Sequence, residues 1–121
     1  MKSYTLILTA YTTGAEPEFG SEEWKAYAAK WGEFNEEAGK AGILKAGQAI
    51  QPPNTARTVR VNDGIIEAHN GPFAEIKENI IGWYQIQCDD IETAIEWAAK
   101  VPNAKCGFGA VEVRPDIEFA P

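Results

Sequence analysis

The residues with the clearest chemical potential lie together just past the middle of the chain. His69 is the one histidine of the sequence, and an imidazole that titrates near neutrality suits a general base. Asn70 follows it and begins the turn Asn70-Gly71-Pro72. An amide cannot take up a proton, so Asn70 itself is not a general base. The alternative is a purely structural turn, because Asn and Gly tolerate positive φ and Pro fixes the exit of the chain.

Glu75 and Lys77 form a second candidate pair. In an extended segment, residues two apart point the same way, so both side chains would project to one side. A Lys beside a Glu can bind an anion or act as an acid–base pair, and it can equally be a solvated salt bridge that contributes little. Phe73 lies between the turn and this pair, where it either packs in the core or forms a wall of the cleft.

Aromatic residues recur at helical spacing in the first third of the chain. Trp24, Tyr27, Trp31 and Phe34 fall on one face of a helix, and such a stripe is usually buried in a core. Trp31 or Tyr27 could also line an apolar ligand pocket between helix and sheet. Gln48 could then supply a polar contact to the ligand.

The two cysteines, Cys88 and Cys106, are too few for a disulfide framework and lack the spacing of metal ligands. A lone His without a second His or a Cys pair is likewise a poor metal site. Cys88 precedes a predicted helix start, where a thiolate would be stabilised, but its place on a buried strand predicts an inert thiol. We therefore expect no metal site, no cofactor, and reduced thiols in a cytoplasmic protein.

Length and charge narrow the class of protein. A chain of 121 residues with 45% hydrophobic residues fits one globular domain, which we assign to residues 1–121. The 11 basic and 18 acidic residues give a net charge of -7 without a Lys/Arg cluster. Because phosphates and anionic lipids attract basic patches, we expect neither direct nucleic-acid binding nor membrane association.

Hydrophobic periodicity predicts a strand, a helix and a strand in the first half. Residues 4–10 alternate with a period of two, which is typical of a strand rather than a signal peptide. Ser21 suits the N-cap of the helix that the aromatic stripe indicates, and Gly42 lies where helix ends favour glycine. Residues 43–50 predict a second strand, which Pro52-Pro53 ends.

The second half predicts a hairpin, a strand, a helix and a strand. Residues 57–61 and 65–68 flank Asn62-Asp63-Gly64, a strong hairpin signal. Residues 80–88 predict the next strand, and residues 110–114 predict the last.

The helix between those two strands has its own start and stop signals. Asp89 and Glu92 suggest a capping box at its start, and Pro102 is expected to end it. Its apolar face would comprise Ile91, Ala94, Ile95, Ala98 and Val101.

This order of elements predicts an α+β fold, a ferredoxin-like βαββαβ sandwich with an inserted β-hairpin. Two helices cover only one face of such a sheet, yet the strand at 80–88 is apolar on both faces. Ile80, Tyr84 and Ile86 are expected on one side, opposite Ile81 and Trp83. An exposed apolar face is unfavourable by ~25 cal/mol per Å², so we expect two copies to pair face to face as a homodimer.

The region of the turn carries a family resemblance. Asn70-Gly71-Pro72-Phe73-Ala74-Glu75-Ile76-Lys77-Glu78 is followed by Gly82-Trp83-Tyr84 and by Cys88-Asp89-Asp90. This block resembles the signature of the YCII-related family, often called the DGPF family after its turn, in which the first residue is usually Asp. The resemblance spans nearly the whole chain. It implies a ferredoxin-like fold that pairs into a dimeric α/β barrel.

The resemblance also bears on the site. It implies that the side chain of residue 70 lies at the mouth of a cleft beside the sheet, where it would orient a polar substrate. Some family members carry a His in the first helix, where this chain has Trp31. A His–Asp dyad of the family is therefore absent here at both positions.

Three classes of function fit these observations. The first is a small-molecule-binding homodimer that takes a small polar or aromatic ligand. Whether it also catalyses a reaction without a cofactor, in the cleft by the Asn70-Gly71-Pro72-Phe73 turn, stays an open alternative. The candidate catalytic residues are His69, Asn70, Glu75 and Lys77, and the candidate ligand contacts are Trp31, Gln48, Asn70, Phe73 and Lys77. The second class, which the resemblance implies, is a regulatory module associated with extracytoplasmic-function sigma factors. The third is a structural dimer without a ligand.

Overall fold

Strands and helices alternate along the chain as the periodicity predicts. The computed structural model describes residues 1–11, 16–72 and 77–119. The predicted strands are confirmed to within two residues at each end, and no helix in the described ranges is long and apolar enough to cross a membrane. The elements are, in order, β1 (Lys2–Tyr11), α1 (Glu22–Lys40), β2 (Leu44–Ala49), a 3-10 turn (Pro53–Thr55), β3 (Arg57–Asn62), β4 (Ile65–Asn70), β5 (Glu78–Cys88), α2 (Ile91–Ala98), α3 (Pro102–Lys105) and β6 (Val111–Pro115).

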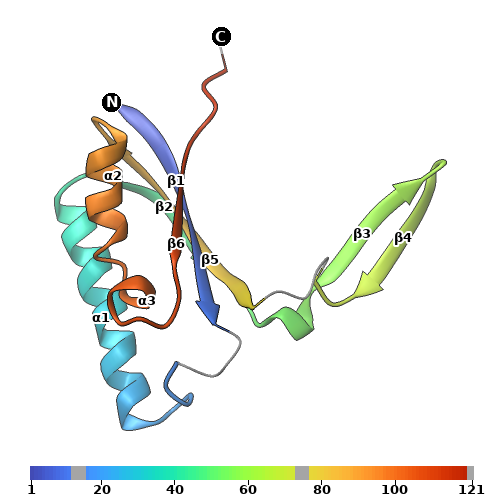
Figure 1. Cartoon of the computed structure of the whole chain (residues 1–121), viewed down its shortest axis with the longest axis horizontal. Helices are drawn as coiled ribbons and strands as arrows, with labels where there is room; N and C mark the ends of the chain where they lie inside the picture. Colours follow the sequence, from blue (N-terminus) through green and yellow to red (C-terminus); the bar gives the residue numbers. More distant parts are fainter. Residues whose placement is uncertain (12–15, 73–76, 120–121) are drawn as a thin grey trace.

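Four of the strands form an antiparallel sheet in the order β2-β5-β1-β6. β5, which comes late in the sequence, is inserted between β1 and β2. With α1 following β1 and α2 following β5, this order is ferredoxin-like, as predicted. Both helices lie along the same side of the sheet (Figure 1), which leaves its other side without a helical cover.

The hydrophobic core lies between the sheet and the two helices. Along β1, Tyr4, Leu6 and Leu8 are buried while the residues between them are partly exposed. Phe34 and Ala38 of α1 pack onto this row, together with Ile86, Ala94, Ala98 and Val101. Burying one such aliphatic side chain contributes about 1.5–3 kcal/mol, so this face of the sheet supplies most of the stability.

The ends of α1 confirm the predicted caps. The Ser21 hydroxyl accepts a hydrogen bond from the Trp24 backbone N–H at 3.1 Å. Gly42, just past the last turn, has φ of 74°, a left-handed conformation that glycine adopts without strain. These two residues therefore determine the length of the helix that carries the aromatic stripe.

The start and end of α2 differ from the prediction. Asp90, not Asp89, is the N-cap, and its carboxylate accepts hydrogen bonds from the backbone N–H and the hydroxyl of Thr93. The predicted capping box with Glu92 is therefore wrong by one residue. Pro102 does not end α2 but begins the short helix α3, where a missing N–H is harmless.

The predicted apolar face of α2 is only partly buried. Ala94 and Ala98 lie in the core, whereas Ile91 and Ile95 are exposed. The small residues are the ones that allow the helix to approach the sheet closely. Trp97 packs against the core from beside them, with its ring 6.3 Å from that of Phe34.

A bulge corrects the predicted faces of β5. Leu8 pairs with Gly82 but Thr9 pairs with Ile80, so Ile81 is the extra residue. Because directly paired residues project to the same side, Ile80 lies with Thr9 on the uncovered side of the sheet, not with Tyr84 as predicted. We call this uncovered side, which also carries Trp83, the open face.

The open face is more polar than the sequence suggests. The carboxylate of Asp116 accepts hydrogen bonds from the hydroxyls of Ser3 and Thr5 and from the Gln85 amide. Burial alone would raise the pKa of Asp116, but these three hydrogen bonds outweigh it and lower the pKa. The open face therefore combines an apolar centre with a satisfied polar cluster at one end.

The inserted hairpin is confirmed and forms a separate two-stranded sheet of β3 and β4. Asp63 and Gly64 both have positive φ, as a two-residue type I′ turn requires. Figure 1 shows this hairpin extending away from the four-stranded sheet. We call residues 57–70 the arm and the remainder the body.

The corrected cap of α2 gives a testable difference between two neighbouring aspartates. Asp90→Ala removes the acceptor for two hydrogen bonds, so it should lower the thermal midpoint by several degrees in a circular-dichroism melt. Asp89→Ala should leave the midpoint unchanged. The Thr93 hydrogen bonds lower the pKa of Asp90 from its ordinary value of 3.8. The difference should therefore be full above pH 4 and disappear as the pH falls through that lowered pKa. Equal effects of the two variants would contradict the assignment.

Candidate functional site

A cavity of about 690 Å³ lies between the N-terminal half of α1 and the β2–β5 edge of the sheet. This volume is in the range that holds a small organic ligand. On α1 the lining residues recur at three- and four-residue steps, which places them on one helix face. The cavity is lined by Leu8, Glu16, Phe19, Trp24, Tyr27, Ala28, Trp31, Asn35, Gly47, Gln48, Ala49, Ile50, Ile81, Gly82, Trp83 and Tyr84.

Aromatic rings form much of the wall. The Trp31 ring lies 6.0 Å from that of Tyr27, edge to face, and 6.4 Å from that of Tyr84. The rings of Phe19 and Trp24 lie tilted against each other with a centroid distance of 4.6 Å. Such contacts hold the rings in defined orientations, so the wall suits a flat apolar ligand.

The absence of a side chain at Gly47 makes room for the Tyr84 ring in the cavity wall. Gly47 is paired with Tyr84 across the β2–β5 ladder. A Cβ at residue 47 would lie 2.5 Å from Cδ1 of the Tyr84 ring, closer than any normal contact. Glycine at this position therefore lets the Tyr84 ring lie flat along β2.

The polar groups of the cavity differ in how they are satisfied. The Tyr84 hydroxyl donates to Oδ1 of Asn35 at 2.6 Å. Burial raises the pKa of Tyr84, and the hydrogen bond to Asn35 partly offsets this rise. Tyr84 and Asn35 thus form a neutral pair that links the sheet to α1.

Tyr27 is different, because its hydroxyl is buried and has no hydrogen-bond partner among the described residues. Burial raises the pKa of Tyr27 to about 12, and the nearby carboxylate of Glu16 contributes to the rise. The hydroxyl therefore keeps its proton at neutral pH, with the Trp31 indole and the Glu16 carboxylate close enough to influence its pKa. A buried polar group without a partner is unfavourable by about 1–3 kcal/mol.

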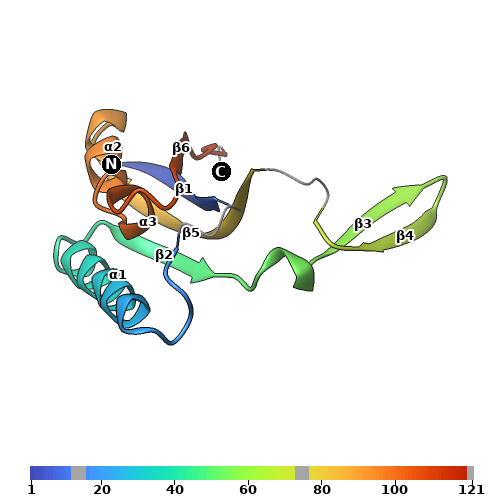
Figure 2. The ribbon, with the colours of Figure 1, turned by 60° about the horizontal axis from the view of Figure 1, so that its bottom comes forward.

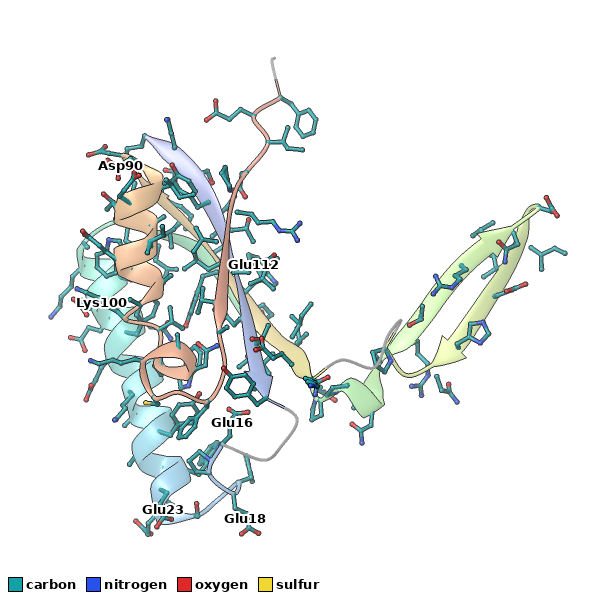
Figure 3. All side chains as sticks on the ribbon, in the orientation of Figure 1. Glu16, Glu18, Glu23, Asp90, Lys100 and Glu112 are labelled. Carbon is teal, nitrogen blue, oxygen red and sulfur yellow. The ribbon has the colours of Figure 1, made fainter. Side chains whose placement is uncertain are left out.

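Glu16 is the one charged side chain that lines the cavity among the residues the structure describes. It is partly buried, and Figure 3 shows it beside the lower half of α1, with Glu18 and Glu23 below it. In the sequence this segment lies between the predicted strand at residues 4–10 and the helix that Ser21 caps, and it carries no other structural signal. Its acidic composition next to the aromatic stripe was the signal that could have identified Glu16.

The structure brings only part of the predicted ligand set together. Trp31 lies in the cavity wall, as predicted, and Tyr27 lies beside it. Gln48 contributes to the lining, but it is paired with Trp83, which puts its side chain on the open face. There its amide donates to the carbonyl oxygen of Ala49.

The predicted catalytic residues lie elsewhere. His69 and Asn70 are exposed at the end of β4 in the arm, and Lys77 is exposed just before β5. None of these three residues lines the cavity. Phe73 and Glu75 lie outside the described residues. A cleft by the turn therefore stays a prediction, and Pro72 of the turn lines a second hollow of about 390 Å³ rather than this cavity.

The turn has a structural role in this fold. Gly71 has φ of 98°, its N–H donates to the carbonyl oxygen of Ala56, and its own carbonyl accepts from the Thr58 hydroxyl. Asn70 is paired with Arg57 directly beside it. The start of the family signature thus closes the base of the arm.

The cysteines lie outside the cavity. Cys88 is buried, and burial raises the pKa of its thiol, in agreement with the predicted inert role. The Cys106 sulfur lies 3.9 Å from Nζ of Lys30. In the described parts of the chain, no three His, Cys, Asp or Glu side chains come together as metal ligands would.

Known proteins of similar sequence and fold agree with this architecture. The chain is 36% identical over 85 residues to an uncharacterized protein from Rhizobium meliloti (strain 1021), a match of 70% of this chain and 66% of that protein, just under two thirds of its length. A solved structure with the same fold is 5-chloro-2-hydroxyhydroquinone dehydrochlorinase from Burkholderia phenoliruptrix AC1100, in complex with 2,5-dihydroxybenzoquinone. It matches with a TM-score of 0.50 and 12% identity over 92% of this chain and 90% of that one.

The sequence as a whole fits one family description. The model of the YCII-related domain matches residues 4–120, which includes the sheet, both long helices and the arm. This span confirms the resemblance that the turn and the strand after it suggested. The chain therefore belongs to the YCII-related family.

Proposed function

We propose that this protein binds a small planar aromatic compound, of the hydroxylated benzene or quinone class, in the cavity between α1, β2 and β5. The proposal is supported by the volume of the cavity and by its aromatic wall. A flat ring can stack on or meet the edges of Trp31 and Tyr84, and such contacts contribute about 0.5–1.5 kcal/mol each beyond the buried area.

The observation that carries the proposal is the Tyr27 hydroxyl. Tyr27 lines the cavity, and its hydroxyl is buried without a partner among the described residues and stays protonated. A small turn of the side chain toward a bound ligand would let this hydroxyl donate to it. A ring carbonyl or phenolic oxygen accepts the hydrogen bond that it can donate. A purely aliphatic ligand would leave the hydroxyl unsatisfied.

The ligand of the structural neighbour has this chemistry. 2,5-Dihydroxybenzoquinone is a flat ring that carries both carbonyl and hydroxyl groups. The low sequence identity transfers the fold and not the reaction, so the likeness supports a class of ligand rather than a substrate.

Any proton transfer in this proposal falls to Glu16. It is the carboxylate that lines the cavity, so it would accept the proton of a bound phenolic hydroxyl without a cofactor. His69, Asn70 and Lys77 lie outside the cavity of their own chain and have no part in this step.

We also propose that the protein acts as a homodimer through the open face. Ile80, near the start of β5, and Trp83, at its middle, are exposed on this side, which no described helix covers, and a second sheet stacked about 10 Å away would bury both. The Asp116 cluster is already satisfied within one chain, so it can enter such an interface without an unpaired charge.

Ligand binding can be tested directly with 2,5-dihydroxybenzoquinone in a calorimetric titration. Tyr27→Phe should weaken binding about tenfold, the value of one lost hydrogen bond of about 1–1.5 kcal/mol. The matched control is Tyr11→Phe, since Tyr11 is exposed and outside the lining. Cyclohexane-1,4-diol, which lacks a flat ring, should not bind. Equal affinity of the two variants would remove Tyr27 from the site, and no binding by the wild type to quinones or phenols would refute the proposal.

Tyr27→Phe should also change stability in the opposite direction. Because the variant lacks the unsatisfied hydroxyl, its free energy of unfolding at pH 7 should equal or exceed that of the wild type by up to about 1 kcal/mol. The raised pKa adds a pH signature. Because the pKa of Tyr27 rises from 10.0 to about 12 on folding, the wild type should lose stability relative to the variant as the pH rises from 10 toward about 12. Urea denaturation at pH 7, 10 and 11 should show this loss relative to the variant, and parallel pH profiles would contradict it.

The homodimer can be tested with two isoleucines of similar exposure. Ile80 on the open face is 45% exposed and Ile95 on α2 is 53% exposed. Ile80→Lys should raise the dimer dissociation constant about tenfold or more, because two copies of the residue are buried in a symmetric interface. Ile95→Lys should not change it. Sedimentation velocity over a concentration series measures both, and a monomeric wild type would refute the dimer.

A further inference from the structure

The arm has two chemically different faces. Cross-strand partners project to the same side, so the pairs Val59–Ala68 and Val61–Ile66 form one apolar face. The opposite face carries the pairs Thr58–His69, Arg60–Glu67 and Asn62–Ile65. This separation is the pattern of a hairpin that buries one side and leaves the other in water.

The apolar face nevertheless has no cover from the residues of its own chain that the structure describes. Val59, Val61 and Ile66 are all exposed, and Ile66 most of all, at 74%. Figures 1 and 2 show the arm pointing away from the body in both views. A two-stranded hairpin is marginally stable in water by itself, so this face needs a partner.

The direction of the arm is determined at its base. The Gly71 N–H and the Arg57 guanidinium both donate to the carbonyl oxygen of Ala56, and Thr58 donates back to Gly71. Next to these contacts lies an apolar hollow of about 390 Å³, lined in part by Ile50, Pro52, Pro53, Pro72 and Ile80. The arm thus begins from a braced base and presents its apolar face beyond the body.

We propose that the apolar face of the arm packs on the body of a second copy of this chain. The proposal rests on the homodimer proposed above and is continuous with it. Ile50 and Ile80 are exposed at the ends of β2 and β5, beside the open face. They supply an apolar surface on the partner that the arm can reach when two open faces meet.

The distribution of charge favours a second copy of this chain as the partner of the arm. Two arginines and two acidic residues, Arg57, Arg60, Asp63 and Glu67, make the arm neutral, so the whole net charge of -7 belongs to the body. Two such bodies repel each other, and the arm is a segment that can approach the partner without that repulsion.

The buried area that a stable interface needs favours packing of the arm on the partner's body rather than on the partner's arm. The six-residue strands of the arm are about 20 Å long, so two arms stacked on each other would bury far less than the roughly 1,200–2,000 Å² of a stable interface. In a twofold dimer each arm–body contact occurs twice. The two arms then add to the sheet contact on both sides.

Two adjacent isoleucines provide the test. Ile66 lies on the apolar face, and Ile65, on the polar face, is also exposed, at 65%. Ile66→Lys should raise the dimer dissociation constant about tenfold or more, measured by sedimentation velocity. Ile65→Lys, the same change one residue away, should leave it unchanged. Quinone binding and the circular-dichroism spectrum should be retained in both variants, because neither residue touches the cavity or the core.

Hydrogen exchange followed by mass spectrometry measures the protection of the backbone amides of the arm directly. Backbone amides of residues 57–70 should be protected in the wild-type dimer and exchange at least about tenfold faster in Ile66→Lys. A wild-type dimer whose arm exchanges freely would overturn the arm contact while the homodimer stands. Equal effects of the two lysine variants on dimerisation would overturn it as well. A monomeric wild type would overturn both, and ligand binding by that monomer would still support the cavity.

Discussion

The packing of α1 on one face of the sheet is the interaction on which the rest of the structure depends. Its C-terminal half brings Phe34 and Ala38 against β1 and closes the core. Its N-terminal half carries Trp24, Tyr27 and Trp31, which line the cavity together with residues of β2 and β5. One amphipathic helix therefore both completes the core and forms one wall of the cavity.

The same packing leaves the molecule unequal on its two sides. The two helices cover one face of the four-stranded sheet, so within the described parts of the chain the other face and the arm remain uncovered. Both carry exposed aliphatic residues, Ile80 on the sheet and Ile66 on the arm. The open face and the helix-covered face, beside which the cavity lies, are thus opposite sides of one sheet, although Ile50 and Trp83 contribute to the cavity lining and to the proposed assembly surface.

The turn of the family signature closes the base of the arm and does not lie in the cavity. Gly71 and Pro72 follow the last strand of the arm, and the hydrogen bonds of Gly71 to Ala56 and Thr58 close its base. Replacing the usual Asp by Asn70 removes a charge at this junction, not in the cavity. The chemistry proposed for the cavity relies instead on Tyr27 and Glu16, which lie far from the signature in the sequence.

The sequence by itself determined the local properties of the fold. These are the alternation of apolar residues in β1, the Asp63-Gly64 turn and the caps at Ser21 and Gly42. It also determined the order of elements, from which the ferredoxin-like sheet follows. The faces of β5 could not be predicted, because a bulge at Ile81 arises from pairing with β1 and moves Ile80 to the other side.

The composition of the site likewise depends on the tertiary structure. Tyr27 is an ordinary helix residue until Trp31 and Phe108 pack against its ring, and Glu16 is an ordinary loop residue until the cavity forms beside it. Burial without a partner and proximity of a charge both depend on segments distant along the chain. Local pattern therefore determined which elements form, whereas only their packing decided which side chains share a cavity.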